Sequence, residues 1–194
     1  MITIDTLEEH RVDFDQSSGW MFVEEGQSQT RPEHQDQVIP LNPEASAFLW
    51  AYEGINFPCS MHPPRAKYFR DVELWHEGSE QQVKKWLYRR GIPFDRKVLL
   101  SVQPTRGFAI TWKMVIKYSS RIFISDQTVF DKTLNWWLTY HHDGDFHFCQ
   151  NPIYGPEQGY RDWAENQRMI QEFRDTARLA EGRQKFSKNP FLKP

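Results

Sequence analysis

Apolar and polar side chains alternate most clearly between Phe108 and Tyr118. A period of two is that of a half-buried β-strand, because successive side chains of a strand point to opposite faces. The pattern therefore predicts one long strand over 108–118, with Trp112 in the core and Lys113 facing solvent. The apolar face of this strand would consist of Phe108, Ile110, Trp112, Met114, Ile116 and Tyr118.

Helix signals stand out in the first half of the chain. Residues 42–44 read Asn-Pro-Glu, which is typical of a helix start, so we expect a helix over 45–52 that ends at Gly54. Residues 79–82, Ser-Glu-Gln-Gln, match a capping box and predict a second helix over 79–90.

The connections around these helices are less regular. We expect a short strand at 20–24, a polar loop over 26–37 and an irregular connection over 57–70. The last of these contains Pro58, Pro63 and Pro64, and proline removes a backbone donor from any regular element.

Turn residues predict further strands on either side of the 108–118 segment. Strands over 98–103 and 121–125 would complete an antiparallel meander, because turn-type residues separate them from the central strand. After these strands, Asp131 is expected to cap a helix, and a fourth strand would follow over 145–149. The inward stripe of that helix would be formed by Leu134, Trp137, Leu138 and His141.

The order of these elements predicts an α+β fold. We expect an antiparallel sheet of about four or five strands packed against helices, with an extended C-terminal helix. Residues 1–156 would form a single domain, and 157–194 would form the C-terminal helix and a basic tail docked on it. Pairing of this helix with a second copy of the chain, giving a homo-oligomer, is the alternative.

Composition and charge support one compact body. The chain has 194 residues, of which 15% are aromatic, and we expect most of its eight tryptophans in the core. Residues 1–60 contain two basic and eleven acidic residues, whereas the remainder is net positive. We interpret this asymmetry as an acidic N-terminal part that packs on a basic body within one molecule; an acidic partner on the basic face is the alternative.

No signal peptide or apolar membrane span is found, and the two cysteines form no disulfide framework. We therefore expect a cytoplasmic protein without membrane association. Glycine-rich phosphate loops, nucleophile elbows and HExxH motifs are also missing from the sequence. Nothing in it calls for a cofactor.

The densest group of metal-ligand side chains lies at 141–149, His-His-Asp-Gly-Asp-Phe-His-Phe-Cys. On a strand, Asp145, His147 and Cys149 would share one face, and His142 at the preceding turn is within reach of them. Nitrogen, oxygen and sulfur donors of this kind suit zinc. The candidate metal ligands are His142, Asp145 and His147, and the alternative is a polar outward face without a metal.

A second candidate site is a basic patch of Lys113, Lys117 and Arg121. Basic side chains on a sheet suit nucleic acid when aromatic residues share their face. Here the aromatic residues of the predicted strand lie on the opposite face, and the pI is about 6.4. We therefore expect this patch to contact another protein and disfavour nucleic acid.

Three segments resemble a family of small bacterial proteins of unknown function. They are Ile39–Trp50, Thr111-Trp112-Lys113 and the aromatic-acidic turn Ile122–Asp126; Ser119-Ser120 departs from the pattern, which leads us to expect a bulky residue there. The resemblance implies a bacterial, cytoplasmic protein, and no functional residue is carried over from it.

Together these observations predict a non-enzymatic protein that binds another macromolecule, in the manner of adaptors or toxin-neutralising immunity proteins. The alternative is a metal-dependent hydrolase with its site near residues 141–149, in which the metal would activate water.

Overall fold

The computed structural model describes residues 1–14, 20–24, 27, 30–56, 68–76, 78–153, 161, 164–165, 167–176 and 178. These residues contain seven strands: β1 (Val38–Pro40), β2 (Phe69–His76), β3 (Lys97–Gln103), β4 (Arg106–Thr111), β5 (Gln127–Phe130), β6 (Trp136–His141) and β7 (Asp145–Pro152). They form one antiparallel sheet in the order β1-β4-β3-β5-β6-β7-β2. The predicted α+β class is confirmed, but the sheet is larger than the four or five strands expected.

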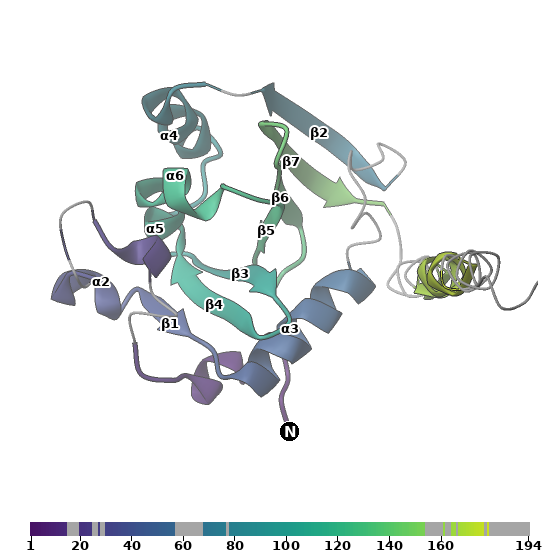
Figure 1. Ribbon diagram of the computed structural model, residues 1–194. Helices are drawn as coiled ribbons and strands as arrows, with labels where there is room; N and C mark the ends of the chain where they lie inside the picture. Colours follow the sequence, from purple (N-terminus) through teal and green to yellow (C-terminus); the bar gives the residue numbers. More distant parts are fainter. Residues whose placement is uncertain are drawn as a thin grey trace, which may run out of the picture.

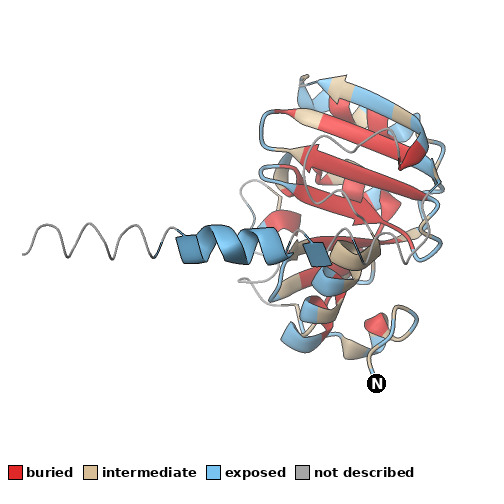
Figure 2. Ribbon diagram, turned by 90° about the vertical axis from the view of Figure 1, so that its right-hand side faces the viewer, coloured by how far each residue is buried: buried red, intermediate tan, exposed pale blue. Residues whose placement is uncertain are grey.

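Helices cover both faces of this sheet (Figure 1). They are η1 (Leu7–His10), η2 (Trp20–Phe22), α2 (Pro32–Gln35), α3 (Pro43–Asn56), α4 (Glu80–Tyr88), α5 (Trp112–Lys117) and α6 (Ser119–Ile122). The longest, α3, lies on one face, and α4, α5 and α6 lie on the other. Because the sheet is covered twice, most of its strand residues are buried (Figure 2).

Two hydrophobic cores result, one on each side of the sheet. Trp112, Met114 and Trp136 belong to the core beneath α4, α5 and α6. Phe130 and Trp137 belong to the core beneath α3. Strand alternation explains this division, because neighbouring residues such as Trp136 and Trp137 on β6 point to opposite faces.

The two predicted helix starts are confirmed by their caps. Before α3, Asn42 Oδ1 accepts a hydrogen bond from the backbone N–H of Ala45 at 2.8 Å. Before α4, Ser79 Oγ accepts from the Gln82 N–H at 3.4 Å, and Gln82 Oε1 accepts from the Ser79 N–H at 2.8 Å. These bonds satisfy N–H groups that have no partner within the helix. Gly91, just beyond α4, has φ +70°, a conformation that glycine adopts without a steric cost.

The prediction of one long strand over 108–118 is wrong for residues 112–118. Strand β4 ends at Thr111, and Trp112–Lys117 form α5. A strand and a helix both bury Trp112 and Met114. The helix also buries Val115, which the predicted strand placed on its polar face. Packing against the core therefore overrode the β-propensity of this segment.

Three further strand and helix predictions are wrong. Residues 121–125 are not a strand, since Ser119–Ile122 form α6 and the next strand is β5. Residues 20–24 contain the 3-10 turn η2. The helix predicted after Asp131 is replaced by β6, because Asp131 Oδ1 accepts from the Thr133 N–H at 2.9 Å and closes a turn.

The acidic N-terminal part does pack on the basic body. Glu8 pairs with Lys97 at 3.2 Å, and Asp5 lies 3.8 Å from Lys132. Glu24 pairs with Lys117 at 2.7 Å. These contacts between distant segments confirm that the charge asymmetry is at least partly compensated within the molecule.

The C-terminal segment is described only in part. Its described residues between 161 and 178 are helical and exposed, including Phe173 at 76%. Docking of 157–194 on the domain, or its pairing with a second copy, stays a prediction. Most of the connection over 57–70 lies outside the described residues. No helix in the described part of the chain is long and apolar enough to cross a membrane.

Candidate metal centre

The turn between β6 and β7 positions the strongest cluster of ligand side chains. His141 ends β6, and the chain turns through His142, Asp143 and Gly144 into β7. Gly144 has φ +93°, which suits glycine, and its N–H donates to the His141 carbonyl at 2.9 Å. The turn expected before the fourth strand is therefore confirmed, and it holds two histidines side by side at one end of the sheet.

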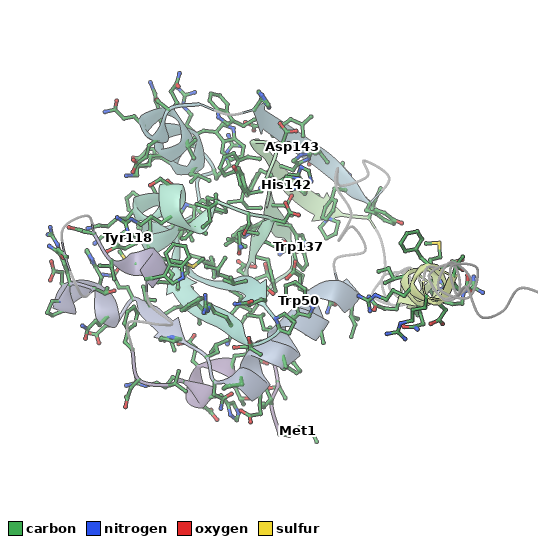
Figure 3. The ribbon with its side chains drawn as sticks, in the orientation of Figure 1. Met1, Trp50, Tyr118, Trp137, His142 and Asp143 are labelled. Carbon is green, nitrogen blue, oxygen red and sulfur yellow. The ribbon has the colours of Figure 1, made fainter. Side chains whose placement is uncertain are left out.

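Asp126 joins this pair from a different part of the chain. Pairing of Gln127 on β5 with Tyr140 on β6 places Asp126 next to His141 across the sheet. Asp126 Oδ1 accepts hydrogen bonds from the backbone N–H of His142 at 2.9 Å and from its Nδ1 at 2.9 Å. His141 Nε2 lies 4.0 Å from the same oxygen. Figure 3 shows His142 and Asp143 at this end of the sheet.

One nitrogen of each histidine and one Asp126 oxygen all lie within 4.8 Å of one another. This is the only group of three such ligands in the part of the chain that the structure describes. Asp143 stands beside it, with Oδ2 3.1 Å from His141 Nδ1 and Oδ1 3.6 Å from His142 Nε2. Imidazole nitrogens and a carboxylate are common zinc ligands. We call the candidate site formed by Asp126, His141 and His142 the metal centre.

The hydrogen bond between Asp126 and His142 shifts the pKa values of both side chains. Burial acts to raise the pKa of Asp126, but the hydrogen bonds from His142 outweigh this and hold the pKa below its usual value. The same side-chain hydrogen bond raises the pKa of His142. Protons and a metal ion therefore compete for His142, and metal binding is expected to weaken as the pH falls.

The other two predicted ligands are not part of this group, although Asp145 pairs with His141 across β6 and β7. Asp145 bonds to His76 on β2, with Oδ1 2.5 Å from Nδ1, and this bond lowers the pKa of Asp145. His147 is buried within the sheet at 4% exposure, and burial lowers its pKa. The structure thus joins His142 to Asp126 and His141 instead of to Asp145 and His147. Asp145 and His147 do share one face of β7, as expected from strand alternation.

The predicted basic patch is divided between helices. Lys113 is exposed on α5, and Arg121 lies on α6. Lys117 is engaged by Glu24, and its Nζ also lies 3.3 Å from His34 Nε2. A patch whose central lysine is already paired within the molecule offers less charge to a partner.

The carboxyl group of Glu53, on the last turn of α3, was not predicted from the sequence. Glu53 is half-buried, and its carboxyl group lies near the hydroxyls of Ser101 and Thr128 on the sheet. Burial raises the pKa of Glu53, and the nearby hydroxyls of Ser101 and Thr128 oppose this only in part. The sequence gives no signal for it, because Glu53 is an ordinary polar residue in a helix.

Glu53 is expected to make folding stability depend on pH. The pKa of Glu53 is higher in the folded state than in the unfolded state, where it is about 4.3. The stability that Glu53 contributes to folding is therefore fully present below the unfolded-state pKa and is lost as the pH rises through the folded-state pKa. The free energy of unfolding of wild type should therefore fall relative to that of Glu53→Gln over this range. Urea unfolding at a series of pH values measures the difference between the two proteins. A difference that does not vary with pH would contradict the raised pKa of Glu53.

Comparisons of the chain with protein-family models, with curated proteins and with solved structures give no match.

Proposed function

We propose that the protein binds a zinc-type divalent ion through Asp126, His141 and His142 and uses it in hydrolysis. The observation that carries this proposal is the convergence of three ligand atoms from two separate segments within 4.8 Å. Three protein ligands are the number found in catalytic zinc sites, where the fourth position is left for water or substrate. Structural zinc sites, by contrast, use four protein ligands.

The exposure of the metal centre suits access by a substrate. The side chains of Asp126 and His142 are 58% and 61% exposed, whereas that of His141 is 22% exposed. A metal ion in such a site lowers the pKa of bound water to near neutrality. Asp143 lies within 4 Å of both histidines and is placed to orient them, as carboxylates do beside metal-binding histidines.

Zinc titration of the purified protein by calorimetry tests this proposal. Wild type should bind one zinc per chain, because the three ligands form a single group. His141→Ala, His142→Ala and Asp126→Asn should each weaken binding by about 100-fold, the upper range for loss of groups that support a metal site. His10→Ala provides the control, since His10 lies outside the metal centre, on η1. Absence of zinc binding, or equal binding by the ligand variants and wild type, would refute the proposal.

Binding of another protein, in an adaptor or immunity-like role, is the second candidate function. Among the described strands, β2 is the last of the sheet and pairs with β7 alone. An edge strand of this length presents unpaired backbone groups that accept an added strand, and Leu74 on it is 65% exposed. Failure of the zinc titration would leave this protein-binding role as the better supported proposal.

A further inference from the structure

A row of polar side chains crosses the face of the sheet on which α3 lies. The pairing register places Ser101, Thr128, Thr139 and His147 opposite one another on β3, β5, β6 and β7. Paired residues of antiparallel strands share a face, with Cβ atoms about 4.5–5.5 Å apart, so the four side chains form one continuous line. None is more than 8% exposed. We call these four residues the polar row.

Two hydroxyl groups in the polar row lack a hydrogen-bond partner. Ser101 Oγ and Thr139 Oγ1 are both buried and make no hydrogen bond. The Glu53 carboxyl group lies close enough to Ser101 Oγ for the hydroxyl to lower its pKa. The two groups do not meet the geometry of a hydrogen bond. Buried hydroxyls of this kind destabilise a protein, and native proteins retain few of them. A ligand that accepts or donates a hydrogen bond would account for them.

The polar row adjoins the metal centre. Thr139 lies two residues before His141 on β6, and Thr128 lies two residues after Asp126. Two residues along a strand span about 6.4–6.8 Å on one face. The exposed fraction rises from 1% at Thr139 to 22% at the His141 side chain. The polar row therefore ends beside the metal centre, next to the partly exposed side chain of His141.

The chemistry of the polar row suits an uncharged group. It offers three hydroxyls, the carboxyl of Glu53 and the imidazole of His147, and burial favours the uncharged forms of the last two. None of these residues is a lysine or an arginine, the side chains that usually bind phosphate or carboxylate. An amide or a hydroxyl group would find both donors and acceptors here.

We propose that the polar row binds an uncharged amide or hydroxyl group of the substrate while an ester or amide bond of that substrate is hydrolysed at the metal centre. This inference rests on the proposed hydrolytic function and specifies its substrate class. Water adds to the carbonyl carbon, the bond to the leaving alcohol or amine breaks, and the leaving group departs with a proton from that water. Thr139 is a binding residue in this scheme.

Hydrolysis by the zinc-loaded full chain tests the inference with three probes. N-acetylglycine 4-nitrophenyl ester carries an amide, 4-nitrophenyl acetate lacks it, and 4-nitrophenyl phosphate is anionic. Wild type should hydrolyse the amide-bearing ester with the highest kcat/KM. Thr139→Val should lower its preference for that ester over the acetate by about 10-fold, the effect of one hydrogen bond. The melting temperature of this variant should rise, because an unpaired buried hydroxyl is removed.

Ser119→Ala is the matched control. Ser119 Oγ is also buried without a partner, but it lies on α6, across the sheet from the polar row. This variant should also gain stability while keeping the wild-type preference. Hydrolysis of no probe, fastest hydrolysis of the phosphate, or an unchanged preference in Thr139→Val would overturn the inference. If zinc binds and an ester is hydrolysed, the error lies in the polar row; if zinc does not bind, or no probe is hydrolysed, the error lies in the proposed hydrolytic metal centre.

Discussion

Replacement of Trp112 with alanine is expected to lower the free energy of unfolding by about 3–5 kcal/mol. Trp112 is fully buried, and its ring packs edge-on against Trp136 with centroids 5.6 Å apart. Its neighbour Lys113 is exposed, so Lys113→Ala should change stability by less than about 0.5 kcal/mol. Equilibrium unfolding in urea measures both variants. Equal losses would contradict the position of this segment in the core.

Trp112 also shows how a pattern predicts burial more reliably than secondary structure. Alternation over 108–118 placed Trp112 inside and Lys113 outside, and both placements are confirmed. The segment is nonetheless a strand only as far as Thr111 and a helix afterwards. Over so few residues an apolar face can be met by either period, and contacts with distant segments decide between them. Those contacts are not visible in the local sequence.

Trp137→Ala is expected to lower the free energy of unfolding by a similar amount, about 3–5 kcal/mol. Trp137 lies on the opposite face of the sheet from Trp112. The Trp137 ring is fully buried and stacks on Phe130, with centroids 4.3 Å apart and planes 29° apart. Trp50→Ala is the control, because Trp50 lies on α3 and is 45% exposed. Thermal unfolding followed by circular dichroism compares the two variants. A loss in Trp50→Ala as large as that in Trp137→Ala would contradict the second core.

The strand that contains Trp137 was predicted as a helix for a physical reason. Strand β6 lies inside the sheet, and all its residues except His141 are buried. A strand buried on both faces loses the alternation that identifies strands, and its apolar run then fits a helical stripe equally well. The helix caps of α3 and α4, by contrast, depend on a few neighbouring residues, and they were predicted correctly.

In the candidate site, too, features set by neighbouring residues were predicted, and features set by distant segments were not. Residues 141–149 were identified because their ligand side chains lie together in sequence, and His142 does lie in one group with Asp126 and His141. Asp126 was missed because only the pairing of β5 with β6 brings it to the histidines. Glu53 and the polar row were missed because they depend on the register of four strands and on where α3 packs.

X-ray absorption at the zinc edge of the zinc-loaded protein tests whether Asp126, His141 and His142 bind the metal. We expect a first shell of nitrogen and oxygen atoms only, with zinc–nitrogen distances of about 2.0–2.1 Å and outer-shell scattering from two imidazole rings. The imidazole signal should fall by half in His142→Ala. A sulfur neighbour at about 2.3 Å, or a spectrum without imidazole scattering, would place the metal elsewhere and contradict the metal centre.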